Sequence, residues 1–185
     1  MRLFIAIELP DEVKQGIAKV RDLLKQGGAD ASWTRPEGIH LTLMFLGEVD
    51  ASRVSEIQQS MALAAQGRGR IRLEVAGAGS FPNEKKPRVI WLGVSGDSDK
   101  LLALQASIGS AMTGLGFEQE ERKFSPHLTL GRIKFPRPRD DWQAMLDRIR
   151  DVRLPAFEAD HVSLMMSELK PSGAVYSEIG RADLQ

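Results

Sequence analysis

The stretch His40-Leu41-Thr42-Leu43 recurs 87 positions later as His127-Leu128-Thr129-Leu130. Successive side chains of a β-strand point to opposite faces, so in each copy the His and the Thr share one face and the two Leu share the other. An imidazole that exchanges a proton near neutral pH therefore stands beside a hydroxyl that can hold an oxygen, twice in one chain. If the two strands lie side by side, the repeat predicts two imidazoles that face one small cavity.

The sequence around the two copies indicates that a whole α+β unit is duplicated. A strand, a helix, the His-x-Thr strand, a helix and a strand are predicted in about residues 2–76 and again in about residues 88–166. No linker rich in Ser, Gly or charge separates the copies, so we expect a single bilobed domain over residues 1–185. The expected fold is α+β, with two pseudo-symmetric lobes around a central cleft, each a mainly antiparallel sheet with flanking helices. A pseudo-two-fold axis would bring both histidines to that cleft.

Apolar periodicity and the positions of Gly and Pro place the individual elements. Helices are predicted where apolar residues recur at helical spacing, in residues 13–24, 54–61, 101–115 and 142–149. Strands are predicted at residues 2–8, 40–46, 71–75, 89–94, from 127 onward, 162–166 and 174–179. Residues 77–87 contain Gly and Pro and are predicted to form a loop.

Composition excludes several classes of protein. The chain has 185 residues and no cysteine, which rules out disulfides, iron–sulfur clusters, thiolate zinc sites and cysteine nucleophiles. Lys and Arg number 25, as do Asp and Glu, so any contact with nucleic acid is expected to be small. The apolar run Leu3-Phe4-Ile5-Ala6-Ile7 is too short for a signal peptide, and no segment is long enough to span a membrane. We therefore expect a cytoplasmic protein with no membrane partner.

The duplicated motif is typical of paired acid–base chemistry. Attack on a phosphodiester requires removal of a proton from the nucleophile and delivery of a proton to the leaving oxygen, and two histidines supply both. Thr42 and Thr129 would donate hydrogen bonds to the non-bridging phosphate oxygens. One alternative is that both histidines are structural and hydrogen-bonded within a sheet. Another is a metal site, but neither copy contains His-x-His or a nearby Asp or Glu. We therefore predict that the site holds no metal and no cofactor.

Other candidates surround the motif. His161 has no counterpart in the repeat and is expected at the surface or at a strand end. Arg132 is a phosphate-binding candidate, but strict alternation places it on the Leu face, so a bulge or strand end would have to turn it inward. Further candidate phosphate contacts lie in the loops before the two histidines: Arg35, Arg122 and Lys123. Phe81 and Tyr176 are candidates to stack on a base, whereas Phe4, Phe45 and Trp91 are assigned mainly to the core.

Taken together, these residues resemble the two-histidine (2H) phosphoesterase superfamily, and within it the RNA 2′,3′-cyclic phosphodiesterases, also called 2′-5′ RNA ligases. The resemblance covers nearly the whole chain. It rests on Arg2–Ile7, His40–Leu43 with Phe45-Leu46-Gly47, Val89–Gly93, Pro126–Leu130 with Arg132, Ser167-Glu168-Leu169, and Tyr176. Met44 is a mild departure, because relatives often carry a polar or basic residue there.

The resemblance implies a metal-independent enzyme that opens a 2′,3′-cyclic phosphate at an RNA 3′ end to a 2′-phosphate. It also implies that His40 is the proton donor and His127 the proton acceptor, an assignment that the nearly identical motifs leave open. Run in reverse with a 5′-hydroxyl end, the same chemistry gives a 2′-5′ linkage. Two alternatives remain, a 2H enzyme for small cyclic nucleotides or 2′-5′ oligonucleotides, and a non-catalytic binder of RNA ends. No obligate protein partner is expected, and the protein is predicted to be a monomer.

Overall fold

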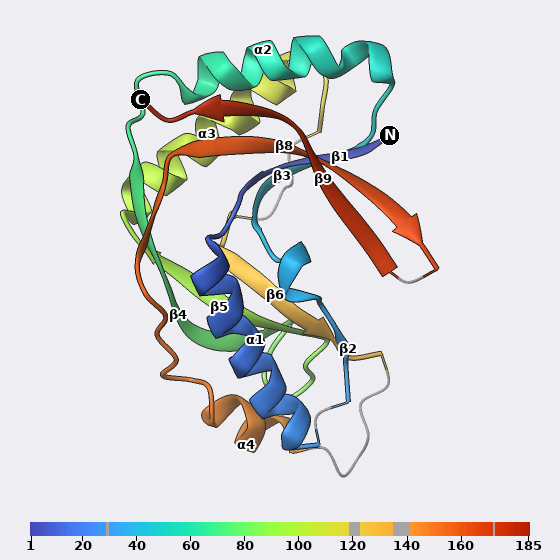
Figure 1. Ribbon diagram of the computed structural model, residues 1–185, viewed down its shortest axis with the longest axis vertical. Helices are drawn as coiled ribbons and strands as arrows, with labels where there is room; N and C mark the ends of the chain where they lie inside the picture. The colour runs from blue at the N-terminus through green and yellow to red at the C-terminus, as the bar shows by residue number, and fades with distance from the viewer. Residues whose placement is uncertain (29, 119–122, 135–140, 172) are drawn as a thin grey trace.

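The strands of the chain form two antiparallel sheets that lie one above the other in Figure 1. The structure is a computed structural model that describes residues 1–28, 30–118, 123–134, 141–171 and 173–185. Helices α2 and α3 lie with the upper sheet, and α1 and α4 with the lower one (Figure 1). The predicted α+β fold with two sheets and flanking helices is confirmed.

In the part of the chain that the structure describes, the upper sheet holds four strands, and two helices pack on it. Its strand order is β3 (Leu41–Glu48), β1 (Arg2–Ile7), β8 (His161–Lys170) and β9 (Gly173–Asp183). Helix α2 (Val54–Ala65) contacts β9 and α3 (Ser98–Gly114), and α3 contacts β3. The turn η2 (Ala51–Arg53) precedes α2, and the Asp50 side chain accepts a hydrogen bond from the backbone N–H of Ser52 at its start.

The lower sheet holds five strands among the residues described. Their order is β2 (Ser32–Trp33), β6 (His127–Arg132), β5 (Val89–Gly96), β4 (Ile71–Phe81) and β7 (Phe157–Ala159). Beside this sheet run α1 (Asp11–Gln26) and α4 (Trp142–Asp147), and the turn η1 (Pro36–Gly38) links β2 to β3. Helix α1 follows the predicted periodicity, since Val13, Ile17, Val20 and Leu24 are all buried.

The two sequence repeats exchange strands between the sheets. The first strand of each repeat, β1 or β5, pairs with the His-x-Thr strand of its own repeat, β3 or β6. Its other neighbour is the last strand of the opposite repeat, so β1 pairs with β8 and β5 with β4. A lobe is therefore not the same as a repeat, which corrects the expectation that a whole lobe was duplicated. Periodicity reports which face of a strand is buried, not which strand lies beside it.

Three further details differ from the prediction. Residues 77–81 are not loop, because β4 continues to Phe81 through a bulge between Val75 and Ala78. Gly77 adopts φ +75 at that bulge, a conformation that favours glycine, so the glycine allows the strand to continue instead of ending it. The strands β8 and β9 are longer than predicted, and the short strands β2 and β7 were missed.

One contiguous apolar core joins the two sheets. It includes Ile5 and Leu164 of the upper sheet and Ile90 and Leu128 of the lower sheet, all fully buried. Because the same core supports both His-x-Thr strands, packing fixes their relative position. No helix among the described residues is long and apolar enough to cross a membrane.

Candidate active site

In both His-x-Thr segments, buried and partly buried side chains alternate as the sequence predicts. Leu41 and Leu43 of β3 are buried, as are Leu128 and Leu130 of β6. The alternating His40, Thr42, His127 and Thr129 are each only partly buried. The leucines thus anchor both strands in the core, and each His shares the other face with its Thr.

The fold also brings the two motifs together. Strands β3 and β6 contact each other, although they belong to different sheets. The segment that leads to His40 is joined to β6, because Ser32 pairs with Arg132 and the backbone N–H of Thr34 donates to the carbonyl of Leu130 (2.8 Å). The prediction that the two motif strands lie next to each other is therefore confirmed.

Aromatic rings hold His40 in place. The imidazole stacks on Phe4 with 4.5 Å between ring centroids, and the Tyr176 ring meets it edge-on at 5.0 Å. Gly38 allows this approach, because a Cβ at that position would lie 2.8 Å from Cε2 of Tyr176. Tyr176, a predicted stacking residue, thus lies against the histidine itself.

The surroundings of His40 favour its neutral form. Burial, together with the nearby positive charge of Lys14, lowers the pKa of His40 from 6.5 to about 4. Lys14 is held by an ion pair with Glu8, 3.0 Å between Nζ and Oε2. In the ligand-free protein the ring is therefore uncharged at neutral pH.

This lowered pKa predicts a loss of stability in acid. Below pH 6.5 the unfolded chain protonates His40, while the folded protein keeps it neutral down to about pH 4. Stability is thus fully present above pH 6.5 and falls toward pH 4, by about 2–3 kcal/mol from this group. Urea unfolding at pH 7.0 and pH 4.5 should show this loss in the wild type and not in His40→Gln. Equal pH dependence in both proteins would contradict the prediction.

His127 is held differently, by a hydrogen bond and two aromatic rings. Its Nδ1 lies 2.7 Å from the carbonyl oxygen of Ser125. A carbonyl only accepts, so Nδ1 carries the hydrogen and Nε2 of the neutral ring has a free lone pair. Phe81 meets the ring edge-on at 5.0 Å, and the Trp91 ring is centred 6.5 Å away. The second predicted stacking residue thus also lies against a histidine.

A β-bulge places Arg132 on the same face as His127. Thr129 pairs with Trp91, but the next residue of β5, Ile90, pairs with Gly131, so β6 holds one extra residue. Arg132 consequently pairs with Val89, which shares a face with Trp91. The bulge that the sequence argument required for Arg132 is present.

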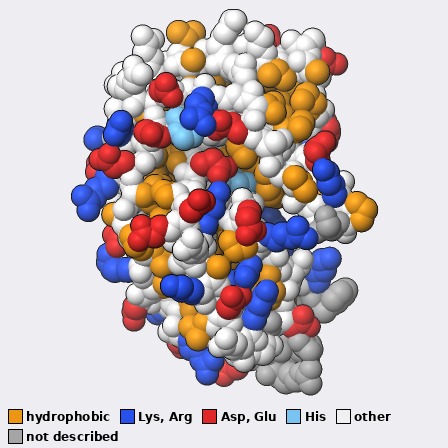
Figure 2. Space-filling view, viewed as in Figure 1, with side chains coloured by type: hydrophobic (Ala, Val, Ile, Leu, Met, Phe, Trp, Pro, Cys, Tyr) orange, Lys and Arg blue, Asp and Glu red, His pale blue; other side chains and the backbone are white. Residues whose placement is uncertain are grey.

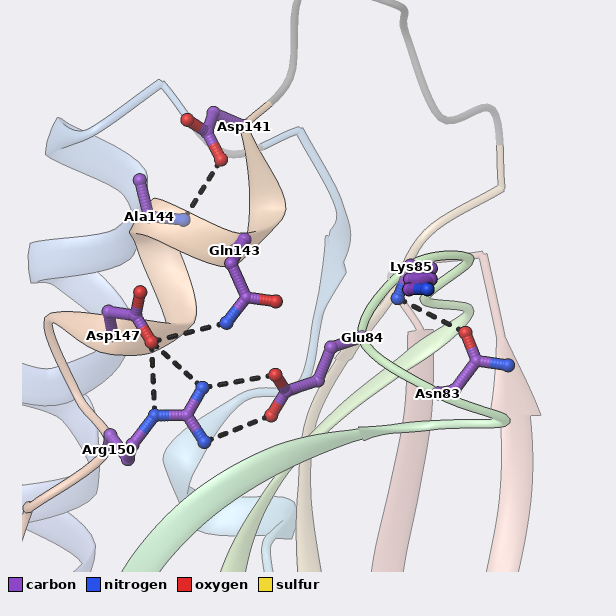
Figure 3. A network of polar contacts seen from close by, with 8 residues as sticks. All are labelled: Asn83, Glu84, Lys85, Asp141, Gln143, Ala144, Asp147 and Arg150. Carbon is purple, nitrogen blue, oxygen red and sulfur yellow. Dashed lines mark hydrogen bonds and ion pairs between the residues drawn. The ribbon is translucent and has the colours of Figure 1, made fainter.

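A polar network braces the loop that follows Phe81. The Arg150 guanidinium donates two hydrogen bonds to Glu84 in that loop (3.1 and 3.0 Å) and two to Asp147 of α4 (3.0 and 2.8 Å) (Figure 3). These bonds lower the pKa of the Glu84 carboxyl, so it stays charged. The brace connects α4 to the end of β4, where Phe81 contacts His127.

Three residues assigned mainly to the core also belong to the surroundings of the histidines. Phe4 and Trp91 contact His40 and His127, and each precedes its histidine by 36 residues, a spacing that could have identified them. The assignment of Phe45 to the core is wrong, because its side chain is 55% exposed. Figure 2 shows one face of the molecule, on which histidine, hydrophobic and charged side chains all reach the surface.

The remaining candidates lie around this site or away from it. Arg35 immediately precedes η1, Lys123 is exposed ahead of His127, and Arg122 lies outside the described residues, so phosphate contacts by these residues stay predictions. His161 begins β8, as predicted for a strand end, and its Nδ1 lies 2.5 Å from Asp160. Within the described ranges, no three His, Cys, Asp or Glu side chains are grouped as a metal site would require.

Two exchanged α+β repeats, each with a His-x-Thr strand, define a phosphoesterase fold of the 2H class. A family model described as LigT like Phosphoesterase matches residues 7–91 and, a second time, residues 92–176. The chain belongs to the LigT-like phosphoesterase family.

Relatives and solved structures agree with this assignment. A Methanothermobacter thermautotrophicus protein named RNA 2′,3′-cyclic phosphodiesterase is 32% identical, over 97% of this chain and 96% of its own. A Thermotoga maritima protein of the same name is 36% identical, over 95% and 91%. A crystal structure of a Thermus thermophilus protein has a TM-score of 0.83 at 28% identity, covering 100% of this chain and 98% of that one. Escherichia coli LigT complexed with 3′-AMP has a TM-score of 0.71 at 27% identity, covering 99% and 97%.

Proposed function

We propose that this protein hydrolyses the 2′,3′-cyclic phosphate at RNA 3′ ends to a 2′-phosphate, without a metal ion. The main support is the pair of His-x-Thr strands that the fold brings into contact. The substrate class is taken from the relatives named RNA 2′,3′-cyclic phosphodiesterase, at 32% and 36% identity over nearly the whole chain. In this proposal the phosphate lies in a central cleft between the two motifs.

His127 is the proton acceptor. Its Nδ1–H donates to the Ser125 carbonyl, which leaves Nε2 free to take a proton from a water molecule. The water oxygen then bonds to phosphorus as the bond from phosphorus to O3′ breaks. The hydrogen bond to Ser125 also stabilises the imidazolium that forms, since both ring nitrogens then carry hydrogens.

His40 is the proton donor and protonates the departing O3′. Its ring is neutral in the free protein, because burial and Lys14 lower its pKa to about 4. The negative charge of the bound phosphodiester favours the imidazolium and thereby offsets that lowering. His40 is thus charged chiefly when substrate is present, next to the oxygen that needs the proton.

Thr42, Thr129 and Arg132 hold the phosphate. The hydroxyl of each Thr shares a face with its His and donates to a non-bridging oxygen, and Arg132 adds a positive charge on the His127 side. The same steps with a 5′-hydroxyl end in place of water form a bond from O5′ to phosphorus as the bond to O3′ breaks, and so give a 2′-5′ linkage.

The direct test is to incubate EDTA-treated protein with a short RNA that ends in a 2′,3′-cyclic phosphate. We expect a 2′-phosphate as the sole product, identified by chromatography against 2′- and 3′-phosphate standards, at a rate that EDTA does not change. A 3′-phosphate product, or activity that EDTA removes and Zn²⁺ restores, would contradict the mechanism.

The same assay separates the alternatives when a free 2′,3′-cyclic mononucleotide is run alongside the RNA. A higher kcat/KM for the mononucleotide would favour a small-nucleotide enzyme. Binding of the RNA without turnover would favour a non-catalytic binder of RNA ends.

A further inference from the structure

Four exposed cations lie at one end of the lower sheet, next to the strand that carries His127. Two are in the loop between β4 and β5, one ends that loop, and one follows β6. They are Lys85, Lys86, Arg88 and Lys134, which we call the basic edge. The backbone N–H of Ile133 donates to the carbonyl of Arg88 (2.9 Å), so the two segments lie side by side although they are far apart in the sequence.

The basic edge has no acidic partner in the part of the chain that the structure describes. All the ion pairs there involve other cations. The loop between β4 and β5 contains one carboxylate, Glu84, and both of its oxygens accept hydrogen bonds from Arg150 (Figure 3). Because neighbouring like charges repel one another, a bound polyanion is favoured at this edge.

Lys134 extends the functional face of β6 beyond Arg132. Arg132 shares the face of His127 because of the bulge in β6. The next residue, Ile133, is buried and Lys134 is exposed, so alternation places Lys134 on the face of Arg132. The Arg88 guanidinium donates to the Lys134 carbonyl (3.1 Å) and holds this segment in place. His127, Arg132 and Lys134 thus form a line that leads away from the candidate active site along one strand.

The basic edge lies on the side from which the nucleophile attacks. This rests on the proposed function, in which His127 accepts the proton of the nucleophile and His40 protonates the departing O3′. In an in-line displacement the attacking group enters opposite the leaving oxygen, and therefore on the His127 side. A water molecule needs no cations along its path. A 5′-hydroxyl, in contrast, is attached to an RNA strand whose phosphates need them.

We propose that the basic edge binds the phosphates of a second RNA strand, whose 5′-hydroxyl takes the place of water. O5′ bonds to phosphorus and gives its proton to Nε2 of His127, while the bond to O3′ breaks and His40 protonates O3′. The second strand follows β6 past Lys134, and Lys85 and Lys86 contact its phosphates from the loop. The cyclic-ended strand lies on the His40 side. The basic edge therefore serves ligation and takes no part in hydrolysis.

Two-substrate kinetics at several salt concentrations tests this proposal. The cyclic-ended RNA is kept saturating, the 5′-hydroxyl RNA is varied, and the 2′-5′ product is measured on a denaturing gel. Lys134→Ala should raise KM for the 5′-hydroxyl strand at low salt and reduce the slope of log KM against log salt by about 0.7, the value for one phosphate contact with a single strand. The double variant Lys85→Ala/Lys86→Ala should reduce this slope by about 1.4, the value for two contacts. KM for hydrolysis of the cyclic-ended RNA, and its salt dependence, should be unchanged.

Lys100→Ala is the matched control, because it removes the same charge from an exposed lysine of α3 that is paired with Asp97 (3.3 Å). It should leave both KM values and both salt slopes unchanged. An unchanged slope for the 5′-hydroxyl strand in Lys134→Ala and in the double variant, an equal effect on hydrolysis, or no ligated product with the wild type would overturn the role of the basic edge. Each of these results is obtained with hydrolysis intact, whereas a wild-type protein that hydrolyses no cyclic-ended RNA would refute the proposed function itself.

Discussion

Replacing His127 with Ala is expected to lower kcat for a cyclic-ended RNA by about 10²- to 10⁴-fold, the usual contribution of a positioned proton-transfer group. The reason is that the variant lacks the free Nε2 that the Nδ1–H bond to Ser125 presents to water. His40→Ala should lose activity on the same scale, because O3′ would then depart without a proton. Steady-state kinetics with EDTA present measures both effects.

The third histidine provides the matched control for this experiment. His161 begins β8, where it contacts Asp160 and Glu178, and His161→Ala should keep the wild-type kcat. Thermal unfolding must show that the three variants are folded. Near-wild-type turnover by folded His127→Ala or His40→Ala would show that paired acid–base catalysis is wrong.

Replacing either threonine of the motifs with Val is expected to lower kcat by about 10²- to 10³-fold, the effect of removing one donor to a developing anionic oxygen. Val has nearly the shape of Thr, so packing against the strand should persist while the hydroxyl is lost. Thr42 and Thr129 are both partly exposed on the histidine face, where a phosphate oxygen can reach them. Single-turnover rates of the two variants measure the chemical step directly.

Two substitutions make this result specific. Thr129→Ser retains the hydroxyl and should retain most of the rate. Thr113→Val removes a hydroxyl that bonds the Gly109 carbonyl within α3 and should leave kcat unchanged. If Thr129→Val and Thr113→Val behaved alike, Thr129 would have no role as a phosphate donor.

The sequence predicted which faces of the two motif strands are buried better than it predicted the residues around the motifs. The His-x-Thr alternation was enough to predict which side chains of β3 and β6 are buried, because one face of each strand carries only leucine toward the core. The alternation of side chains between the two faces is interrupted one residue after each Thr, because a bulge shifts the register of both strands there. Because of this shift, strict alternation wrongly predicts that Phe45 lies in the core. It also places Arg132 on the histidine face only if a bulge is assumed.

Two further predictions were wrong. Glycines led to the prediction of a loop at residues 77–81, and pairing between distant strands made the lobes differ from the repeats. The glycines after Val75 resemble a loop in sequence, yet Gly79 faces Trp91 across the pair, where a Cβ would lie 2.5 Å from the indole. The glycines there make room for a neighbouring ring. Which strand completes each sheet depends on contacts between residues far apart in the chain, and local periodicity carries no information about them.

The exchange of β4 and β8 has a consequence for the origin of the molecule. A polypeptide with a single copy of the repeat would reproduce these pairings by exchanging its last strand with that of a second, identical polypeptide. The fold thus has the strand pairing of a strand-swapped homodimer whose two chains are joined end to end. In such a dimer the two histidines would be equivalent by symmetry. In a single chain the two halves can differ, and Phe45 and Arg132 occupy corresponding positions, each three residues after the Thr of its motif.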